Sequence, residues 1–519
     1  MTAPLLCTVD VGTGSARAGI IDAGGHLLGR AAHPIAIRRC AAAMAEHNSD
    51  DIWHAVCASV RGALAASGAR PSDIAALGFG ATCSLVARGV DGGSVPVGID
   101  GAPGWDTIAW LDHRAVAEAH EAARHDKSAG ASPEMQTPKL MWLKRHLPAV
   151  WDRTAHLFDL ADFLTWRATG ADARSACTMI CKWGWGADGA APDALLSALG
   201  LADLPLRAGL PGCAAPVGAS VGGLTPAAAD ALGLPVGLPV AAGMIDAYAG
   251  ALGVLGGLPN ADLADRAALI AGTSSCIMTL SPAPHAIPGL WGPYRGVTLP
   301  GMWAAEGGQS AAGGLLDHIV RQHGAGLDAS EATHAAIAAR VAQLRAAQGD
   351  AFAADIHVVP DFHGARSPFS DPGARGMIVG LDLDGSFDAL CALWWRAAVG
   401  LALGLGQIVD HMHDHGRPTA VLRLGGGHAR SPLLAQLYAD ATGRAVQTAP
   451  GGDAMLLGAA ICAAAAGGVH PSLRAAAIAM APGMTRRDPD PARRSALAHD
   501  RRVLAKLQAL RRDIAGLRA

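Results

Sequence analysis

The sequence has 519 residues, with 41 basic and 44 acidic side chains and a formal net charge of −3. One hydrophobic core stops growing near about 250–300 residues, so this length predicts about two domains. Hydrophobic residues make up 51% and charged residues 16%, which excludes a disordered chain, and the near-neutral charge offers no field for nucleic acid.

The N-terminal residues, the apolar stretches and the cysteines indicate the cellular compartment of the protein. The first residues, MTAPLLCTVDVGTG, lack the charged start and cleavable apolar core of a signal peptide. Apolar stretches such as residues 454–468 are alanine-rich and too short to span a bilayer. The 10 cysteines show no disulfide-framework spacing. We therefore expect a soluble cytoplasmic enzyme without nucleic-acid or membrane partners.

The first elements are predicted to be strands joined by a glycine-rich turn. Leu5–Val11 is largely apolar, the turn GTGS follows at residues 12–15, and residues 18–21 resume the apolar pattern. The spacing further along predicts a helix over residues 50–67 capped by Ser49 or Asp50, strands over 74–80 and 85–88, and helices over 112–126 and 138–146.

The opening theme returns in the second half of the chain. Residues 267–270 are apolar, a GTSS turn follows at 272–275, and residues 276–280 are apolar again. Two such hairpins predict two related domains facing one another, although chance repetition of a common turn is an alternative. Downstream we expect a helix over 387–415, a strand over 421–424 that enters a GGG turn, a helix over 432–442, a strand over 446–448 and a helix over 454–465.

The tail from residue 485 onward is rich in arginine. Its apolar residues are spaced four and three apart, as on one face of a helix: Val503, Leu507, Leu510, Ile514 and Leu517. This pattern predicts an amphipathic helix docked on the body with a solvated basic face, and a nucleic-acid-binding arm is the less favoured reading.

Both glycine turns have chemical groups that can bind phosphate. They offer backbone N–H groups and hydroxyls without bulky side chains, and Asp10 before the first turn is suited to hold Mg²⁺ through water. Two such turns across a cleft would hold a triphosphate from both sides. Neither turn matches a Walker loop or a Rossmann fingerprint, and one glycine turn alone is a weak signal.

Three more charged residues stand out, and each has two readings. Asp246, framed by apolar residues, is either a general base or a helix N-cap. Lys182, beside Trp183, is a ligand-binding lysine or a surface lysine. Glu306 precedes a glycine pair, a pattern that is more often a turn than a ligand site.

Eight motifs, taken in order, resemble the FGGY family of carbohydrate kinases. They are DVGTGSARAGI, WLDHRA, PKLMWLKRH, AGMIDAYAGALG, AGTSSCIMTLS, EGGQS, LGGGHARSPLLAQLYADATG and GDAMLLGAA, and the match runs from residue 9 to about 468. The TCSLV stretch at 82–86, with WLDHR at 110–114, resembles the ribulokinase branch and its D-ribulokinase clade. Ser431 departs from the family, because many relatives carry asparagine there.

This resemblance implies an α/β fold with two actin-like (ribonuclease-H-like) ATPase domains around a central cleft. The domains would span residues 1–258, mainly for sugar, and 259–470, mainly for ATP, with a tail at 471–519. The implied reaction transfers phosphate from ATP, with Mg²⁺, to a ketopentose, first of all D-ribulose to give D-ribulose 5-phosphate. Alternatives are L-ribulose, xylulose or a pentitol such as ribitol, and, remotely, an actin-like ATPase without a sugar. The sequence does not decide whether the protein forms a homodimer.

The resemblance also assigns residues by position. Asp246 matches the family's catalytic aspartate and would be the general base. The sugar would bind Thr82, Cys83, Asp112, Lys182, Asp246 and Glu306. ATP would bind Asp10, Gly12, Thr13, Ser15, Gly272, Thr273, Ser274, Gly425, Gly426, Gly427 and Asp453, with Asp10 also holding the metal through water.

Overall fold

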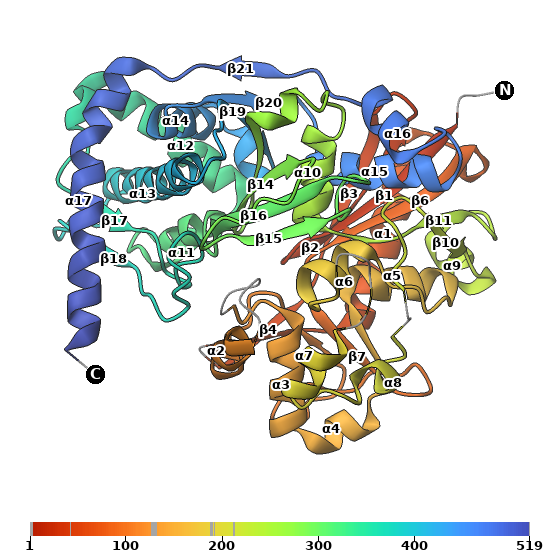
Figure 1. Cartoon of the computed structure of the whole chain (residues 1–519). Coiled ribbons are helices and arrows are strands. Elements are labelled where there is room, and N and C mark those ends of the chain that lie inside the picture. Colours follow the sequence, from red (N-terminus) through yellow and green to blue (C-terminus); the bar gives the residue numbers. More distant parts are fainter. Residues whose placement is uncertain are drawn as a thin grey trace.

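In a computed structural model of the chain, the structure describes residues 4–41, 43–125, 132–186, 190, 192–210 and 213–517. Two large sheets, one from each half of the sequence, dominate the molecule, and helices cover their faces (Figure 1). The mixture of helices and sheets is the α/β architecture that the sequence predicts.

The first large sheet has the strand order β10-β11-β6-β1-β2-β3, with β12 also paired to β6. Strand β1 is antiparallel to β2 and parallel to β6, and β2 is antiparallel to β3. The bounds are β1 Leu5–Val11, β2 Ser15–Asp22, β3 Leu27–Pro34, β6 Ile74–Ala81, β10 Ser220–Gly223, β11 Pro239–Ala241 and β12 Met244–Ile245.

The second large sheet repeats this core, in the order β15-β16-β14-β13-β19-β20-β21. Strand β13 is antiparallel to β14 and parallel to β19, and β14 is antiparallel to β16. The repeat that the two glycine turns predict is therefore confirmed. The bounds are β13 Arg266–Ala271, β14 Ser275–Ser281, β15 Trp291–Arg295, β16 Trp303–Gln309, β19 Val421–Gly425, β20 Ala445–Thr448 and β21 Thr485–Arg487.

A smaller sheet and several helices form the lower part of the first half (Figure 1). Its strand order is β4-β5-β8-β7-β9, with bounds β4 Ile37–Ala41, β5 Met44–His47, β7 Leu85–Arg88, β8 Thr107–Ile108 and β9 His156–Asp159. The helices of the first half are α1 Ser49–Ser67, α2 Val116–His125, α3 Gln136–His146, α4 Pro148–Arg153, α5 Leu160–Thr169, α6 Ala176–Lys182, α7 Asp193–Ala198, α8 Leu204–Arg207 and α9 Pro226–Leu232.

The second half packs its helices around a long central one, α13. This helix is long and apolar enough to cross a membrane by composition, but its most apolar window is 83% buried inside the protein, as in a core helix. Helix α13 spans Phe387–Asp414. Around it lie the other helices and a two-stranded sheet: α11 Gly313–Gln322, α12 Glu331–Gln348, α14 Pro432–Thr442, β17 His357–Val359 and β18 Met377–Val379, with α16 Leu473–Ala479 nearer the first sheet.

Two helices cross between the large sheets, α10 (Asp246–Leu255) and α15 (Ala454–Ala466). Their backbones meet at glycine, because a Cβ on Gly458 would lie 1.8 Å from the Ala249 carbonyl oxygen. Helix α15 also packs on the first sheet, where a Cβ on Gly78 would lie 2.2 Å from the Ala459 oxygen. A helix from the second half of the sequence is thus part of the core under the first sheet.

The tail forms a helix, α17 (Pro491–Gly516), along one side of the second half (Figure 1). Only the first part of the predicted apolar stripe faces the body, because Leu507 packs against the core of the second half while Leu510, Ile514 and Leu517 are exposed. Leu504, Gln508 and Arg511 are buried. The docking face therefore combines leucines with polar and ionic contacts, and the last part of the predicted stripe does not belong to it. The last two residues, 518 and 519, lie outside the described residues.

Two predicted helix starts also shift. The N-cap of α1 is Asn48, whose side-chain oxygen accepts hydrogen bonds from the backbone N–H groups of Asp50 and Asp51. Helix α2 begins at Val116 rather than Asp112, because the preceding residues form a turn around a buried ion pair; its predicted end, Asp126, lies outside the described residues.

Candidate active site

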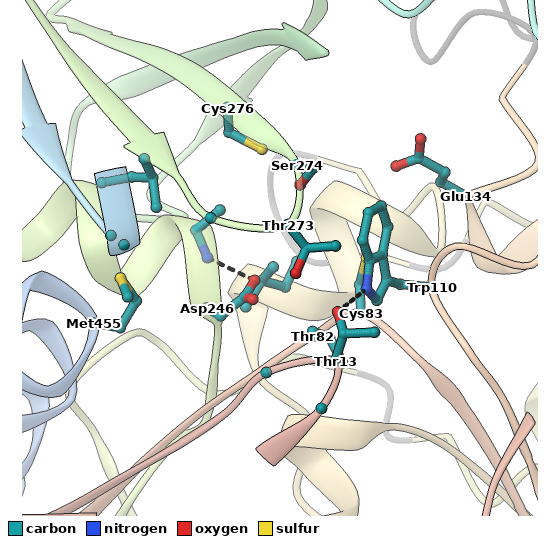
Figure 2. Close-up of a pocket in the computed structure, with 18 of the residues that line it drawn as sticks. Thr13, Thr82, Cys83, Trp110, Glu134, Asp246, Thr273, Ser274, Cys276 and Met455 are labelled. Carbon is teal, nitrogen blue, oxygen red and sulfur yellow. Dashed lines mark hydrogen bonds between the residues drawn. The ribbon is translucent and has the colours of Figure 1, made fainter. Parts of the chain in front are cut away.

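A cavity of about 240 Å³ lies where the two large sheets meet, and residues from both halves line it. The turn after β1 and the turn after β13 both reach it, as Figure 2 shows for Thr13 and Thr273. The β19 turn and the starts of α10 and α15 complete this wall. The predicted facing turns are therefore close together.

The first turn is closed by its own backbone and by a tryptophan. The backbone N–H of Gly12 donates to the Ser15 carbonyl at 3.0 Å. The indole Nε1 of Trp110 donates to the Thr13 hydroxyl at 2.9 Å, the contact dashed in Figure 2. Trp110 thus fixes the Thr13 side chain at the edge of the cavity.

The second turn is anchored from below by α11. The backbone N–H of Gly272 donates to the Ser274 carbonyl at 2.8 Å, much as Gly12 does in the first turn. The carbonyls of Gly272 and Thr273 accept from the N–H groups of Gly313 and Ala312, each at 2.8 Å. With its carbonyls turned toward α11, this turn is rigid while its residues line the cavity.

Asp10 is fully buried at the end of β1, beside the first turn. Arg17 of β2 forms an ion pair with one carboxylate oxygen, and the other, Oδ1, has no hydrogen-bond partner among the described residues. Burial raises the pKa of Asp10, opposed by Arg17 and reinforced by Asp453 and Asp246. A buried carboxylate oxygen without a partner fits a hard cation such as Mg²⁺.

The glycine turn after β19 forms another part of the wall. Gly426 has a φ of +84°, and a Cβ there would lie 2.4 Å from the Ala271 carbonyl oxygen, so only glycine fits. Gly426 and Gly427 line the cavity, whereas Gly425 lies behind them against Ala454.

Asp453 also lies behind the lining residues. It is the N-cap of α15, and its Oδ1 accepts from the Leu456 N–H at 3.3 Å. Its other oxygen lies 4.0 Å from Arg17 and 3.6 Å from Arg30. Through Arg17 it is electrostatically linked to the cavity.

Asp246 lines the cavity from the first position of α10. The N-cap is Ile245, so Asp246 does not fill the capping position that one reading of the sequence gave it. Its Oδ1 accepts from the Ala247 N–H at 2.7 Å, as dashed in Figure 2. Burial raises the pKa of Asp246, which makes its carboxylate a better proton acceptor than an exposed one.

On the sugar side, as the sequence assigns it, the cavity holds two ion pairs. Lys182 Nζ lies 3.7 Å from Glu306 Oε2, and Arg366 Nη2 lies 2.5 Å from Glu134 Oε2. All four side chains are buried. Each pair joins a residue from the first half of the sequence to one from the second, so this group of charges exists only where the halves meet.

Neighbouring charges favour the ionised forms of Glu134 and Lys182. Burial would raise the pKa of Glu134, but Arg366 and Lys182 lower it to about 2. Burial would lower the pKa of Lys182, but Glu306 and other neighbours raise it overall. Glu306 also accepts a hydrogen bond from the Tyr248 hydroxyl at 2.9 Å.

Thr82 and Cys83 line the cavity as predicted, both buried at the end of β6. Asp112 is not among the described residues that line the cavity. Its carboxylate accepts from the Ala45 N–H at 2.6 Å and pairs with Arg114 at 2.8 Å. Asp112 thus takes part in a buried ion pair away from the lining residues, and its assignment to the sugar group stays a prediction.

Among the lining residues that the sequence did not assign to the site, four carry a charge or an aromatic ring: Arg17, Trp110, Glu134 and Arg366. Arg17 and Trp110 lie inside quoted motifs, so their proximity to an assigned residue was the available signal. Glu134 and Arg366 lie in irregular segments, and nothing in the local sequence marks either of them.

Comparisons with known proteins identify the family to which the chain belongs. Residues 5–253 match the N-terminal domain, and residues 267–467 the C-terminal domain, of the FGGY family of carbohydrate kinases. The chain is 39% identical to a human FGGY carbohydrate kinase domain-containing protein, covering 90% of this chain and 89% of that protein. It is 35% identical to a D-ribulokinase of Saccharomyces cerevisiae, covering 84% and 68%. In fold it resembles a ligand-bound xylulose kinase from Lactobacillus acidophilus, with a TM-score of 0.78, 18% identity, and 98% of each chain covered.

Proposed function

Because the chain belongs to the FGGY family of carbohydrate kinases and is a sugar kinase, we propose that its substrate is a ketopentose, with D-ribulose as the preferred one. The product would be D-ribulose 5-phosphate. The similarity to the yeast D-ribulokinase over most of the chain is the observation that carries this choice. The polar side chains on the sugar side of the cavity are compatible with a ligand that offers several hydroxyls.

Asp246 would be the general base of the transfer. A sugar hydroxyl is a weak nucleophile, so a carboxylate must take its proton as the bond to phosphorus forms. Asp246 is supported in this role by its position between the two turns and the two ion pairs, and by the raised pKa that burial gives it. The Ala247 N–H would keep the carboxylate oriented toward the cavity.

The nucleotide would lie along the three glycine turns, since FGGY kinases use ATP, typically with Mg²⁺. Backbone N–H groups of Thr13 and Thr273 are suited to hold phosphate oxygens. Asp10 would hold Mg²⁺ through water, and the metal would supply charge neutralisation for the phosphates. Arg17 beside Asp10 would add a fixed positive charge.

The domain limits stay proposals as well. We place the sugar domain at residues 1–258, the ATP domain at 259–470 and the tail at 471–519. The exchange of α15 onto the first sheet means that neither large domain could keep its whole core if separated. A cytoplasmic location, a homodimer and the lack of nucleic-acid or membrane partners remain predictions.

The test is an ADP-release assay with ATP and Mg²⁺ across D-ribulose, L-ribulose, D- and L-xylulose and ribitol. We expect the highest kcat/KM for D-ribulose, and phosphate on the primary hydroxyl of carbon 5 by NMR of the product. A different preferred pentulose or pentitol would keep the kinase and replace the substrate. ADP release that needs no sugar at all would contradict the ketopentose proposal.

A further inference from the structure

An irregular segment between β17 and β18 reaches from the second half of the molecule to the first. We call residues 361–375 the bridging segment. His363 Nε2 donates to the Leu111 carbonyl at 2.8 Å, and Arg366 pairs with Glu134, so both contact the first half. Ser367 ties the segment to its own half, because its N–H donates to the Gly308 carbonyl at 3.1 Å.

Arg366 is the only residue of this segment, among the described residues, that lines the cavity, and its planar group contacts Glu134 and Glu306. Besides Glu134, its Nη1 lies 3.3 Å from Cys276 Sγ and 3.7 Å from Glu306 Oε1. Its guanidinium stacks on Trp291 at 4.7 Å. A guanidinium has donors in a fixed planar fork, so it holds two acidic groups in fixed directions, whereas the three donors of a lysine rotate.

Trp291 contacts a second cation as well. Lys182 Nζ lies 4.2 Å from the centre of the same ring. Both cations therefore contact the same indole and the same glutamate, Glu306, while Arg366 also pairs with Glu134. Without Arg366, Glu134 would lose its ion pair and Glu306 would keep only Lys182.

The two ends of the bridging segment are joined by a single residue of the C-terminal helix. Arg511 of α17 forms an ion pair with Asp361, and its Nη1 also donates to the Arg375 carbonyl at 3.3 Å. Arg511 is 9% exposed, so this contact is largely shielded from solvent. Farther along α17, Asp500 pairs with Arg396 at 2.5 Å and Gln508 bonds to Gln407 at 2.9 Å, which attaches the helix to α13.

We propose that Arg366 is a positioning residue for the sugar and that Arg511 of the C-terminal helix keeps it in place by clamping the base of the bridging segment. Arg366 would act through Glu134 and Glu306, whose carboxylates it orients. This proposal rests on the proposed placement of the sugar beside Lys182 and Glu306. It gives the basic C-terminal helix a task that the kinase motifs leave unexplained.

The clamp can be tested without any substrate. Arg511→Ala removes both contacts at the base of the bridging segment, so its amide hydrogens should exchange faster with deuterium, by about 10-fold or more. The matched control is Arg512→Ala, which alters the neighbouring, exposed arginine of the same helix. Equal exchange of residues 361–375 in both variants would overturn the clamp.

The effect on the sugar is then measured kinetically, with whichever sugar the wild type phosphorylates best. In Arg511→Ala the sugar KM should rise about 10-fold and the ATP KM less than about 2-fold, because the displaced group is on the sugar side. Arg511→Lys should recover part of the loss. A sugar KM that does not change, or an equal rise in both KM values, would overturn the proposal.

Arg366 itself needs a variant that leaves no buried charge alone. Replacing Arg366 with glutamine would strand Glu134, which destabilises a protein strongly. The double variant Arg366→Gln with Glu134→Gln removes both charges and should remain folded, with a sugar KM at least 10-fold above wild type. Arg366→Lys keeps the charge without the fork and should fall between the two. Wild-type sugar affinity in the folded double variant would refute the positioning role.

These results separate the two proposals. If no sugar of the panel is phosphorylated, the proposed substrate class fails, and the exchange experiment still decides whether Arg511 clamps the segment. If D-ribulose is a good substrate but the variants at 511 and 366 bind it normally, the substrate stands and the positioning role fails.

Discussion

At the scale of single residues, Asp246 has the surroundings that a proton acceptor needs. It lines the cavity, one oxygen is held by the Ala247 N–H, and burial raises its pKa. Asp246→Asn keeps the shape but cannot accept a proton, so kcat should fall by about 10²–10⁴-fold. ATP affinity, measured by calorimetry, should be nearly unchanged. Near-normal turnover in this variant would remove Asp246 from the mechanism.

The raised pKa of Asp246 also predicts a pH dependence of the wild type. The base must be ionised to accept a proton, so kcat/KM for the sugar should fall as the pH drops through the pKa of Asp246. Because burial raises that pKa, the acid limb should lie above the value of about 3.9 for an ordinary aspartate. The measurement is a pH–rate profile with saturating ATP. A kcat/KM for the sugar that stays constant down to a pH of about 4 would contradict this prediction.

Cys83 tests the sugar wall. It is buried beside Thr82 at the end of β6, where both line the cavity (Figure 2). Cys83→Leu adds volume where a sugar would lie, and overpacking costs about 1–3 kcal/mol, so the sugar KM should rise about 5- to 150-fold. The ATP KM should change little, because the nucleotide turns are on other strands.

The control for this experiment is Cys213→Leu, at an exposed cysteine outside the cavity lining. Both proteins should first be shown to be folded by circular dichroism. If Cys83→Leu has the sugar KM of the wild type, the TCS motif does not line the sugar site, and the preference for D-ribulose loses a support.

At the scale of elements, the crossing of α10 and α15 connects the catalytic and nucleotide sides. Asp246 begins α10 and Met455 in the first turn of α15 lines the cavity. A methyl group on Gly458 would lie 1.8 Å from the Ala249 oxygen, which is backbone and cannot rotate away. Gly458→Ala should therefore lower stability by about 3 kcal/mol and lower activity as well.

Thermal unfolding gives the stability comparison for this variant. Gly483→Ala is the matched control, since a Cβ there meets no atom within 4 Å. We expect the control to melt like the wild type and the α15 variant to melt several degrees lower. Equal melting of the two variants would show that the helices separate easily and that the crossing is not tightly packed.

The strands and most helices could be predicted because their cause is local. Alternating or continuous apolar residues ended by glycine turns located β1, β13 and α14, the last at its observed bounds Pro432–Thr442. The start of α1 was missed by one residue because Asn48, Ser49 and Asp50 are all capping residues, and only the fold selects one. Arg366 and Glu134 could not be found, since their pairing across 232 positions of sequence depends on the fold.

The C-terminal helix shows the same limit on its surface. Spacing alone put the docking face on Val503, Leu507, Leu510, Ile514 and Leu517, and the structure leaves the last three exposed. Besides Leu504 and Leu507, arginines and a glutamine dock the helix, because Asp361, Asp410 and Gln407 of the body meet them there. A hydrophobic pattern in the helix cannot predict where polar partners lie on the body.

At the scale of the whole molecule, the cavity lies between the two halves and is lined by residues of both. Lys182 and Glu134 from the first half pair with Glu306 and Arg366 from the second, and the two phosphate turns come from different sheets. A ligand that touches both walls should favour the arrangement in which the halves are close, because it gains contacts only there. Sugar and nucleotide would each contact residues of both halves.

This leads to a prediction about shape. A compact chain of 519 residues has a radius of gyration of about 24 Å. The free protein in solution should lie above this value, and D-ribulose together with a non-hydrolysable ATP analogue should bring it down, more than either ligand alone. The measurement is small-angle X-ray scattering on the free, singly liganded and doubly liganded protein. Closure also has a chemical purpose, because it excludes water that would otherwise attack the γ-phosphate. If both ligands together leave the radius of gyration unchanged, the halves do not move, and the cavity must exclude water in the arrangement described here.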